Sequence, residues 1–249
     1  MDFDFKDQTI LVTGGTGALG SKVSELFLNY APKSIVITYK SENEKINTEK
    51  ALRNQIHVHH KSVNGTVIEF IQANLLDENE VQDLVEKIIK KFGQIHVLAN
   101  IVGGYFGGKS VVDIELREWE RMMNMNLKSA FIISKHVLKS MKTNQFGKIV
   151  HVSSASGIKA AGKDSAYAAS KAGLIRLVDS IKEEVKEFKI NINCILPTII
   201  DTESNRLAMP SANYSNWVKP QDLAKLIVFL SSEDSSVING EAIKTSGYA

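Results

Sequence analysis

Short apolar runs rich in β-branched residues alternate with longer amphipathic stretches along almost the whole chain. The apolar runs cover 9–15, 34–40, 67–75, 94–104, 147–157, 192–198 and 241–247. Apolar residues at helical spacing mark 18–31, 78–92, 114–141, 165–188 and 220–231. Continuous apolar strands that alternate with helices are typical of a parallel sheet buried on both faces. The sequence therefore predicts an α/β fold, a doubly wound parallel sheet of about seven strands with helices on both faces and right-handed crossovers.

The composition excludes several other classes of protein. No linker rich in Pro, Gly or Ser and no internal repeat divides the chain, so we predict a single domain over 1–249. Thirty basic residues against 28 acidic ones give a net charge of +2, which provides no bias toward nucleic acid or an anionic membrane. No apolar run reaches the roughly 20 residues that span a bilayer. With one cysteine and no signal-peptide pattern, we expect a cytoplasmic protein.

Two stretches fit the alternation less well. Residues 41–66 are long for one helical crossover, and we interpret them as a polar strand or loop. They contain His57, His59 and His60, but no cysteine and no H-E-x-x-H pattern supports a metal site, so no metal is predicted. Residues 203–219 follow the sixth predicted strand, where a doubly wound sheet would carry a lid over its active site. We therefore expect a substrate lid in that segment.

A glycine-rich loop, TGGTGALG, lies between the first predicted strand and the first predicted helix. Gly14, Gly17 and Gly20 have the spacing G-x-x-G-x-x-G. Glycine is needed where the backbone turns with positive φ or approaches a ligand closely. Free N–H groups at the start of the following helix attract an anion, so this position favours the pyrophosphate of a dinucleotide. The predicted binding residues in the loop are Gly14, Thr16, Gly17, Ala18, Leu19 and Gly20.

The end of the second predicted strand indicates which dinucleotide binds. An acidic residue at this position accepts hydrogen bonds from the ribose 2′-OH of NAD, whereas a basic residue suits the 2′-phosphate of NADP. Tyr39 and Lys40 occupy the strand tip, and the first acid that follows is Glu42. The sequence therefore favours NADP(H), with NAD(H) as the alternative.

Tyr167 and Lys171 are four residues apart in S-A-Y-A-A-S-K, so in a helix they share one face. A tyrosine has a reference pKa of ~10 and must lose about 3 units, or about 4 kcal/mol, to act near pH 7. A neighbouring ammonium supplies part of that energy. Ser154 ends the fifth predicted strand, where its hydroxyl would reach the same carbonyl oxygen as the tyrosine. Asn126 is polar within a predicted helix, which suggests a structural or water-holding role.

These motifs, in this order, resemble those of the short-chain dehydrogenase/reductase family over nearly the whole chain. The resemblance is carried by the glycine loop, Asn100, Gly103, Asn126, Ser154, Tyr167, Lys171 and L-P-T-I-I-D-T (196–202). It implies a Rossmann fold. It also implies an NAD(P)-dependent oxidoreductase that transfers a hydride between a nicotinamide cofactor and a carbonyl or alcohol substrate.

The resemblance also implies roles for individual residues. Tyr167 would be the general acid/base, and Lys171 would lower its pKa and bind the nicotinamide ribose. Ser154 would hold and polarise the carbonyl, and Asn126 would position a water that links Lys171 to solvent. Further cofactor-binding residues would be Tyr39, Lys40, Asn74, Leu75, Asn100, Gly103, Tyr167, Lys171, Pro197, Ile199 and Thr202.

The resemblance further implies a homo-oligomer, a tetramer or a dimer, built on the helices 114–141 and 165–188. Four residues of the first of these helices are candidates for either core or interface: Met122, Met123, Met125 and Phe131. The substrate itself is not readable from the residues. A group of large side chains suggests an apolar or aromatic enclosure: Tyr105, Phe106, Met209, Tyr214 and Trp217.

Three segments, at 17–20, 103–108 and 196–217, are similar to dihydropteridine reductase, which reduces quinonoid dihydropterin. That enzyme, however, carries an acid at the tip of the second strand and lacks the serine, whereas this chain has Lys40 and Ser154. A carbonyl substrate benefits from a serine, and a quinonoid imine does not need one. We therefore rank carbonyl or alcohol oxidoreduction above pterin reduction. A non-catalytic dinucleotide sensor is a third hypothesis, which the complete Ser/Tyr/Lys/Asn set disfavours.

Overall fold

Seven parallel strands form one sheet in the computed structural model of the chain, which describes residues 3–58 and 65–247. The strands are β1 (Thr9–Thr13), β2 (Ser34–Tyr39), β3 (Val67–Gln72), β4 (Val97–Asn100), β5 (Phe146–Val152), β6 (Lys189–Pro197) and β7 (Ala242–Thr245). Their order is β3-β2-β1-β4-β5-β6-β7, and every neighbouring pair is parallel. The predicted doubly wound sheet is confirmed. Its strand order reverses between β1 and β4, where such sheets bind ligands beyond their carboxyl ends.

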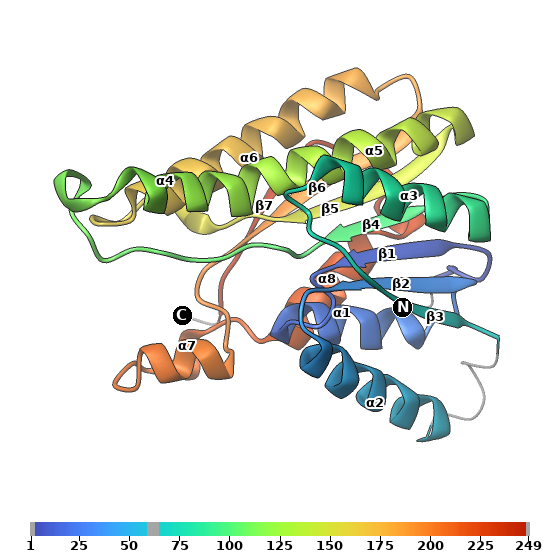
Figure 1. Ribbon diagram of the computed structural model, residues 1–249, viewed down its shortest axis with the longest axis horizontal. Coiled ribbons are helices and arrows are strands. Elements are labelled where there is room, and N and C mark those ends of the chain that lie inside the picture. Colours follow the sequence, from blue (N-terminus) through green and yellow to red (C-terminus); the bar gives the residue numbers. More distant parts are fainter. Residues whose placement is uncertain (1–2, 59–64, 248–249) are drawn as a thin grey trace.

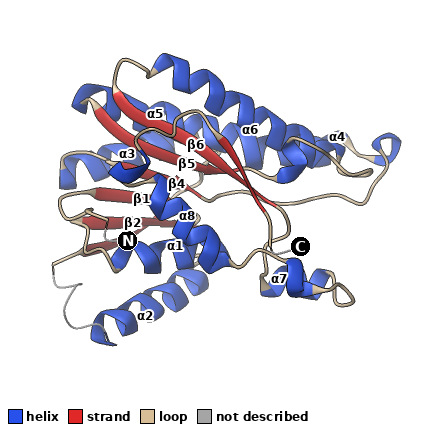
Figure 2. Ribbon diagram, turned by 180° about the vertical axis from the view of Figure 1, so that it is seen from behind, coloured by secondary structure: helices blue, strands red, loops and turns tan. Residues whose placement is uncertain are grey.

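Helices cover both faces of the sheet, as Figures 1 and 2 show. The helices are α1 (Ala18–Leu28), α2 (Glu42–Val58), α3 (Glu78–Phe92), α4 (Leu116–Met123), α5 (Ser129–Asn144), α6 (Ser165–Glu184), α7 (Glu203–Ala208) and α8 (Pro220–Leu230). One apolar core joins α3, α5 and α6 to the sheet, and a second joins α1 and α8 to its other face. In Figure 1, α7 stands apart from both helical layers. Within the described residues, no helix has the length and apolarity needed to cross a membrane.

Most of 41–66 is a helix, and the interpretation of this stretch as a polar strand or loop was wrong. Helix α2 spans Glu42–Val58 and carries an i,i+4 ion pair between Glu49 and Arg53 at 2.6 Å. Over residues 42–54, the part of the helix whose side chains are described, the buried residues are Thr48 and Leu52. This part therefore has almost no apolar periodicity that a sequence pattern could reveal.

Of the three histidines of this stretch, one lies in a described helix and two do not fall within the described residues. His57 falls in the last turn of α2, and His59 and His60 lie outside the described residues. Among 3–58 and 65–247, no group of three or more His, Cys, Asp or Glu side chains is placed to hold a metal ion.

The predicted helix 114–141 is interrupted by a π turn. Helix α4 ends at Met123, the π turn covers Asn124–Lys128, and α5 follows directly. The wider turn buries Asn126 and is closed by Ser129, whose hydroxyl donates to the Met125 carbonyl at 2.6 Å. Single π turns within α-helices are frequent at functional sites.

Several predicted strands extend beyond the hydrogen-bonded ladder at their carboxyl ends, and three of them border the cleft. The ladder stops at Thr13 in β1, Asn100 in β4 and Val152 in β5. The residues that follow are mostly small, with Gly14 at φ +62° and Gly103 and Ser154 at the other two exits. They leave the sheet as loops, and these loops shape the cleft described next.

Candidate active site

A cleft of about 1210 Å³ opens at the carboxyl ends of the central strands and of β6. The predicted site residues that line it are Gly14, Thr16, Gly17, Ala18, Leu19, Gly20, Tyr39, Lys40, Asn74, Leu75, Gly103, Ser154, Tyr167, Lys171, Pro197 and Ile199. Asn100, Asn126 and Thr202 are not among its lining residues. The cleft therefore joins the glycine loop at one end to the Ser/Tyr/Lys group at the other.

The glycine loop has the shape and polarity that an anion requires. Gly14 adopts φ +62°, and a Cβ at Gly20 would collide with the Gly14 carbonyl oxygen, so the loop packs tightly on the start of α1. A Cβ at Gly17 would meet nothing closer than 3.4 Å. Within the described residues, no side chain caps α1 and no acid occupies its first turn. Its N–H groups are therefore available to a pyrophosphate, and the residues present fit a dinucleotide.

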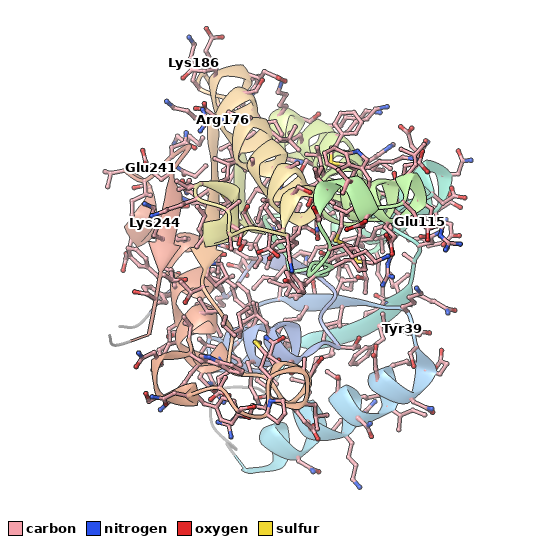
Figure 3. All side chains as sticks on the ribbon, turned by 90° about the vertical axis from the view of Figure 1, so that its left-hand side faces the viewer. Tyr39, Glu115, Arg176, Lys186, Glu241 and Lys244 are labelled. Carbon is pink, nitrogen blue, oxygen red and sulfur yellow. The ribbon has the colours of Figure 1, made fainter. Side chains whose placement is uncertain are left out.

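The tip of β2 carries a small polar cluster, which lines the same cleft as the glycine loop. Tyr39 lies where the chain leaves β2 for α2 (Figure 3). Its hydroxyl donates to Glu42 Oε1 at 2.5 Å, and Lys45 pairs with the other oxygen of Glu42 at 3.2 Å. Glu44, a second acid, accepts a hydrogen bond from the Thr16 hydroxyl at 3.3 Å and lines the cleft. Sequence reasoning missed Glu44 because it did not predict the helix that carries it.

The structure brings Tyr167, Lys171 and Ser154 together at the other end of the cleft. Tyr167 and Lys171 project from one face of α6, with the Lys171 Nζ 5.9 Å from the centroid of the Tyr167 ring. Ser154, at the exit of β5, lines the same part of the cleft, and its hydroxyl lowers the pKa of Tyr167. A phenol, an ammonium and a hydroxyl therefore converge on one small volume that a substrate oxygen would share.

Burial dominates the protonation of this group. It raises the pKa of Tyr167, the neighbouring Ser154 hydroxyl lowers it, and the Asp164 carboxylate raises it further. Burial also lowers the pKa of Lys171 to about 8. In the protein without cofactor, the pKa of Tyr167 is therefore raised and not lowered as expected. Burial destabilises the phenolate more than the neighbouring groups stabilise it.

Lys171 is held from two sides. Its Nζ donates to the Val152 carbonyl at 2.9 Å, and its own carbonyl accepts from the Ser153 hydroxyl at 2.9 Å. A Cβ at Gly103 would lie 3.1 Å from the Lys171 Nζ and 3.0 Å from Asn126 Oδ1. Glycine at 103 thus leaves room for both polar groups beside the backbone.

Asn126 acts from behind the cleft wall. Its amide exchanges two hydrogen bonds with the backbone of Gly104, at 2.9 and 3.0 Å. The same amide donates to the Ser170 hydroxyl at 3.0 Å, and Ser170 donates to the Tyr167 carbonyl at 2.7 Å. Asn126 therefore ties the loop after β4 to the helix that carries Tyr167.

Asn100 and Thr202 also support the site without lining it. Asn100 accepts from the Thr13 hydroxyl at 2.5 Å and donates to His151 Nδ1 at 2.9 Å. Burial lowers the pKa of His151 to about 3, so its ring is neutral and this nitrogen accepts. Thr202 caps the N-terminus of α7 with its hydroxyl.

The substrate half of the cleft is lined by polar as well as large apolar side chains. Of the large side chains predicted to form it, Tyr105 and Met209 line the cleft. Tyr214 and Trp217 pack on each other instead, with ring centroids 4.6 Å apart. Four polar residues that line the cleft were not predicted: Ser156, Lys159, Asp164 and Asn205. These positions lie in loops, in short helices or directly before a helix, where the sequence offers no clear pattern.

Comparison with known proteins identifies the family. The family model described as short chain dehydrogenase matches residues 8–211, so the chain belongs to the short-chain dehydrogenase/reductase family. It is an oxidoreductase that interconverts carbonyl compounds and alcohols with a nicotinamide cofactor.

Relatives that differ from one another in substrate resemble the chain over most of its length. The FabG 3-oxoacyl-[acyl-carrier-protein] reductase of Thermotoga maritima is 28% identical over 245 residues, 95% of each chain. The NAD-dependent glycerol dehydrogenase of Listeria innocua is 26% identical over 255 residues, 99% of this chain and 95% of the relative. The solved structure of levodione reductase has a TM-score of 0.88 at 24% identity and covers 98% of this chain and 97% of its own, which is a likeness of fold.

Proposed function

We propose that the chain reduces a ketone or aldehyde, or oxidises the matching alcohol, with Tyr167 as the general acid/base and NADP(H) as the preferred cofactor. The convergence of Tyr167, Ser154 and Lys171 at one end of a cleft that begins at the glycine loop carries this proposal. When bound, the cofactor supplies or accepts the hydride. The residues of the chain bind and orient both reactants and move the proton.

In the reducing direction the Tyr167 hydroxyl donates its proton to the substrate oxygen, and Ser154 holds that oxygen with a second hydrogen bond. A raised pKa keeps Tyr167 protonated in the free protein, which suits a proton donor. Lys171 stays charged below its pKa of about 8 and favours the phenolate that forms as the proton leaves. In the oxidising direction the same phenolate accepts the alcohol proton.

Ser154→Ala separates carbonyl reduction from pterin reduction. Removing one hydrogen-bond donor to a developing oxyanion costs about 10²–10³-fold in kcat. We expect that loss for the best carbonyl substrate found by following NADPH and NADH oxidation at 340 nm. A variant that retains full activity, with quinonoid dihydropterin as the best substrate, would favour the pterin alternative. Dinucleotide binding without turnover of any compound would favour the sensor.

Lys40 and Glu44 oppose each other in the choice of cofactor. Both line the cleft near the tip of β2, while Glu42 is already paired with Lys45. Lys40 suits a 2′-phosphate, which supports NADP(H), and Glu44 would accept from a 2′-OH and repel a phosphate.

Lys40→Ala should weaken NADP⁺ binding by roughly 10–100-fold, the value of a charged hydrogen bond, with little effect on NAD⁺. Glu44→Gln should change the ratio of the two dissociation constants in the opposite direction, in favour of NADP⁺ over NAD⁺. Calorimetric titration of the apo protein measures both constants, and Lys225→Ala on the distant helix α8 serves as the control. Equal effects on both dinucleotides would exclude Lys40 as the discriminating residue.

We further propose that 203–219 is the substrate lid and that the chain forms a dimer or tetramer. Asn205 and Met209 of the segment line the cleft, which supports a lid. Met122 is buried core, whereas Phe131 on α5 is 48% exposed, which supports an interface there. If the dinucleotide did not protect 203–219 from hydrogen exchange, the lid proposal would be contradicted. A solution mass of a single 27.5 kDa chain would contradict the proposed oligomer.

A further inference from the structure

We propose that Tyr105 and Asp164 form a clasp that positions Tyr167 and biases it toward its protonated form. This inference rests on the proposed role of Tyr167 as the general acid/base. Tyr105 lies in the loop after β4, and Asp164 immediately precedes α6. Both line the substrate half of the cleft.

The clasp contacts Tyr167 directly. The Tyr105 hydroxyl donates to Asp164 Oδ1 at 2.8 Å. The Tyr105 and Tyr167 rings meet edge to face, with centroids 5.0 Å apart and an interplanar angle of 78°. Such aromatic pairs prefer this geometry and are stabilised beyond the burial of their area. Tyr105 is 63% exposed, so its ring lies at the mouth of the cleft while its hydroxyl is engaged.

Two further features show that the two loops are fitted to each other. The Gly108 N–H donates to the Lys163 carbonyl at 2.9 Å, which gives a second link between the same segments. A Cβ at Gly107 would collide with the Tyr105 hydroxyl and with the Asp164 carboxylate. The loop at 103–108 therefore needs its glycine at 107 for the clasp to close.

The charges around Tyr167 act in opposite directions. Asp164 precedes its helix and favours the neutral phenol, whereas Lys171 on the same helix favours the phenolate. Ser154 faces it from the exit of β5, and Lys159 also lines the cleft.

Tyr105 faces Tyr167 from the exit of β4. Although the side chain is largely exposed, partial burial of its hydroxyl end, followed by the hydrogen bond to Asp164, raises the pKa of Tyr105 to about 12, so this second phenol stays neutral. It therefore restrains Asp164 without competing with Tyr167 for the proton.

Asp164→Asn tests the electrostatic half of the proposal, because an amide keeps an acceptor for Tyr105 and removes the charge. We expect the ionisation midpoint of Tyr167 to fall by about 0.5 pH unit. Ultraviolet difference titration of tyrosinate in the apo protein measures it, with each protein referenced to its own Tyr167→Phe form. The rising limb of the pH profile of kcat for alcohol oxidation should move the same way. Asp179→Asn, a distant carboxylate on α6, should move neither.

Tyr105→Phe tests the positioning half, because it keeps the ring and removes the hydrogen bond. We expect faster amide hydrogen exchange at 103–108 and in the first turn of α6, with unchanged global melting. An unchanged midpoint in Asp164→Asn, or unchanged exchange in Tyr105→Phe, would overturn the clasp. Full activity of Tyr167→Phe would instead overturn the proposed function, and both apo readouts would still report on the clasp.

Discussion

Replacing Tyr167 by phenylalanine is expected to lower kcat by about 10²–10⁴-fold, the usual contribution of a positioned proton donor. The ring, with its contact to Tyr105, is retained, and only the hydroxyl is lost. The glycine loop lies at the other end of the cleft and is untouched. The dissociation constant for the dinucleotide should therefore change little, which fluorescence titration of the apo protein measures.

Tyr30→Phe is the matched control for this variant. Tyr30 packs against Phe3 and Phe5, outside the residues that line the cleft, and loses the same single oxygen. It should retain normal turnover. If Tyr167→Phe kept more than about a tenth of the wild-type kcat, the assignment of the proton donor would be wrong.

Replacing Lys171 by methionine is expected to stabilise the fold and abolish most of the activity. Lys171 is 4% exposed, and burial lowers its pKa to about 8 from an ordinary value near 10.5. The unfolded chain therefore binds this proton more tightly than the folded one, so the buried ammonium destabilises the fold fully below pH 8. That penalty fades as the pH rises from about 8 to about 10.5.

At pH 7 the Lys171→Met variant should therefore gain about 1–3 kcal/mol in the free energy of unfolding, less the cost of leaving the Val152 carbonyl without its donor. Near pH 10 the gain should largely vanish. Urea unfolding of both proteins at the two pH values measures it. Lys186→Met, at an exposed lysine near the end of α6 (Figure 3), should show no such pH-dependent gain. A variant that is less stable than wild type at pH 7 would contradict the destabilising role of the buried charge.

The sheet could be predicted because its strands are short runs rich in apolar and β-branched residues. The buried runs of β1 and β2 and the glycine loop after β1 form a local pattern that needs no knowledge of distant residues. The pairing of Tyr167 with Lys171 follows in the same way, from helical spacing alone. Helix α2 could not be found by that route, because residues 42–54, whose side chains are described, bury only Thr48 and Leu52.

The rest of the site depends on contacts between residues far apart in the chain. Tyr105 meets Asp164 across 59 positions, and Thr16 meets Glu44 across 28. Neither pair has a local signature, because both lie in loops or at helix starts whose positions the whole fold determines. The rise in the pKa of Tyr167 was missed for a related reason: spacing reveals a neighbouring ammonium but not the loss of water around the phenol.

The π turn between α4 and α5 holds one residue more than an α-helical turn needs. One residue removed from Asn124–Lys128 would therefore close the wide turn to an α-helical one and leave α5 close to its present register, with Ile133 still buried. The deletion should instead displace Asn126 from the backbone of Gly104. The extra residue thus serves the cleft wall and not the stability of the helix, so its removal is expected to lower activity far more than it lowers the melting temperature.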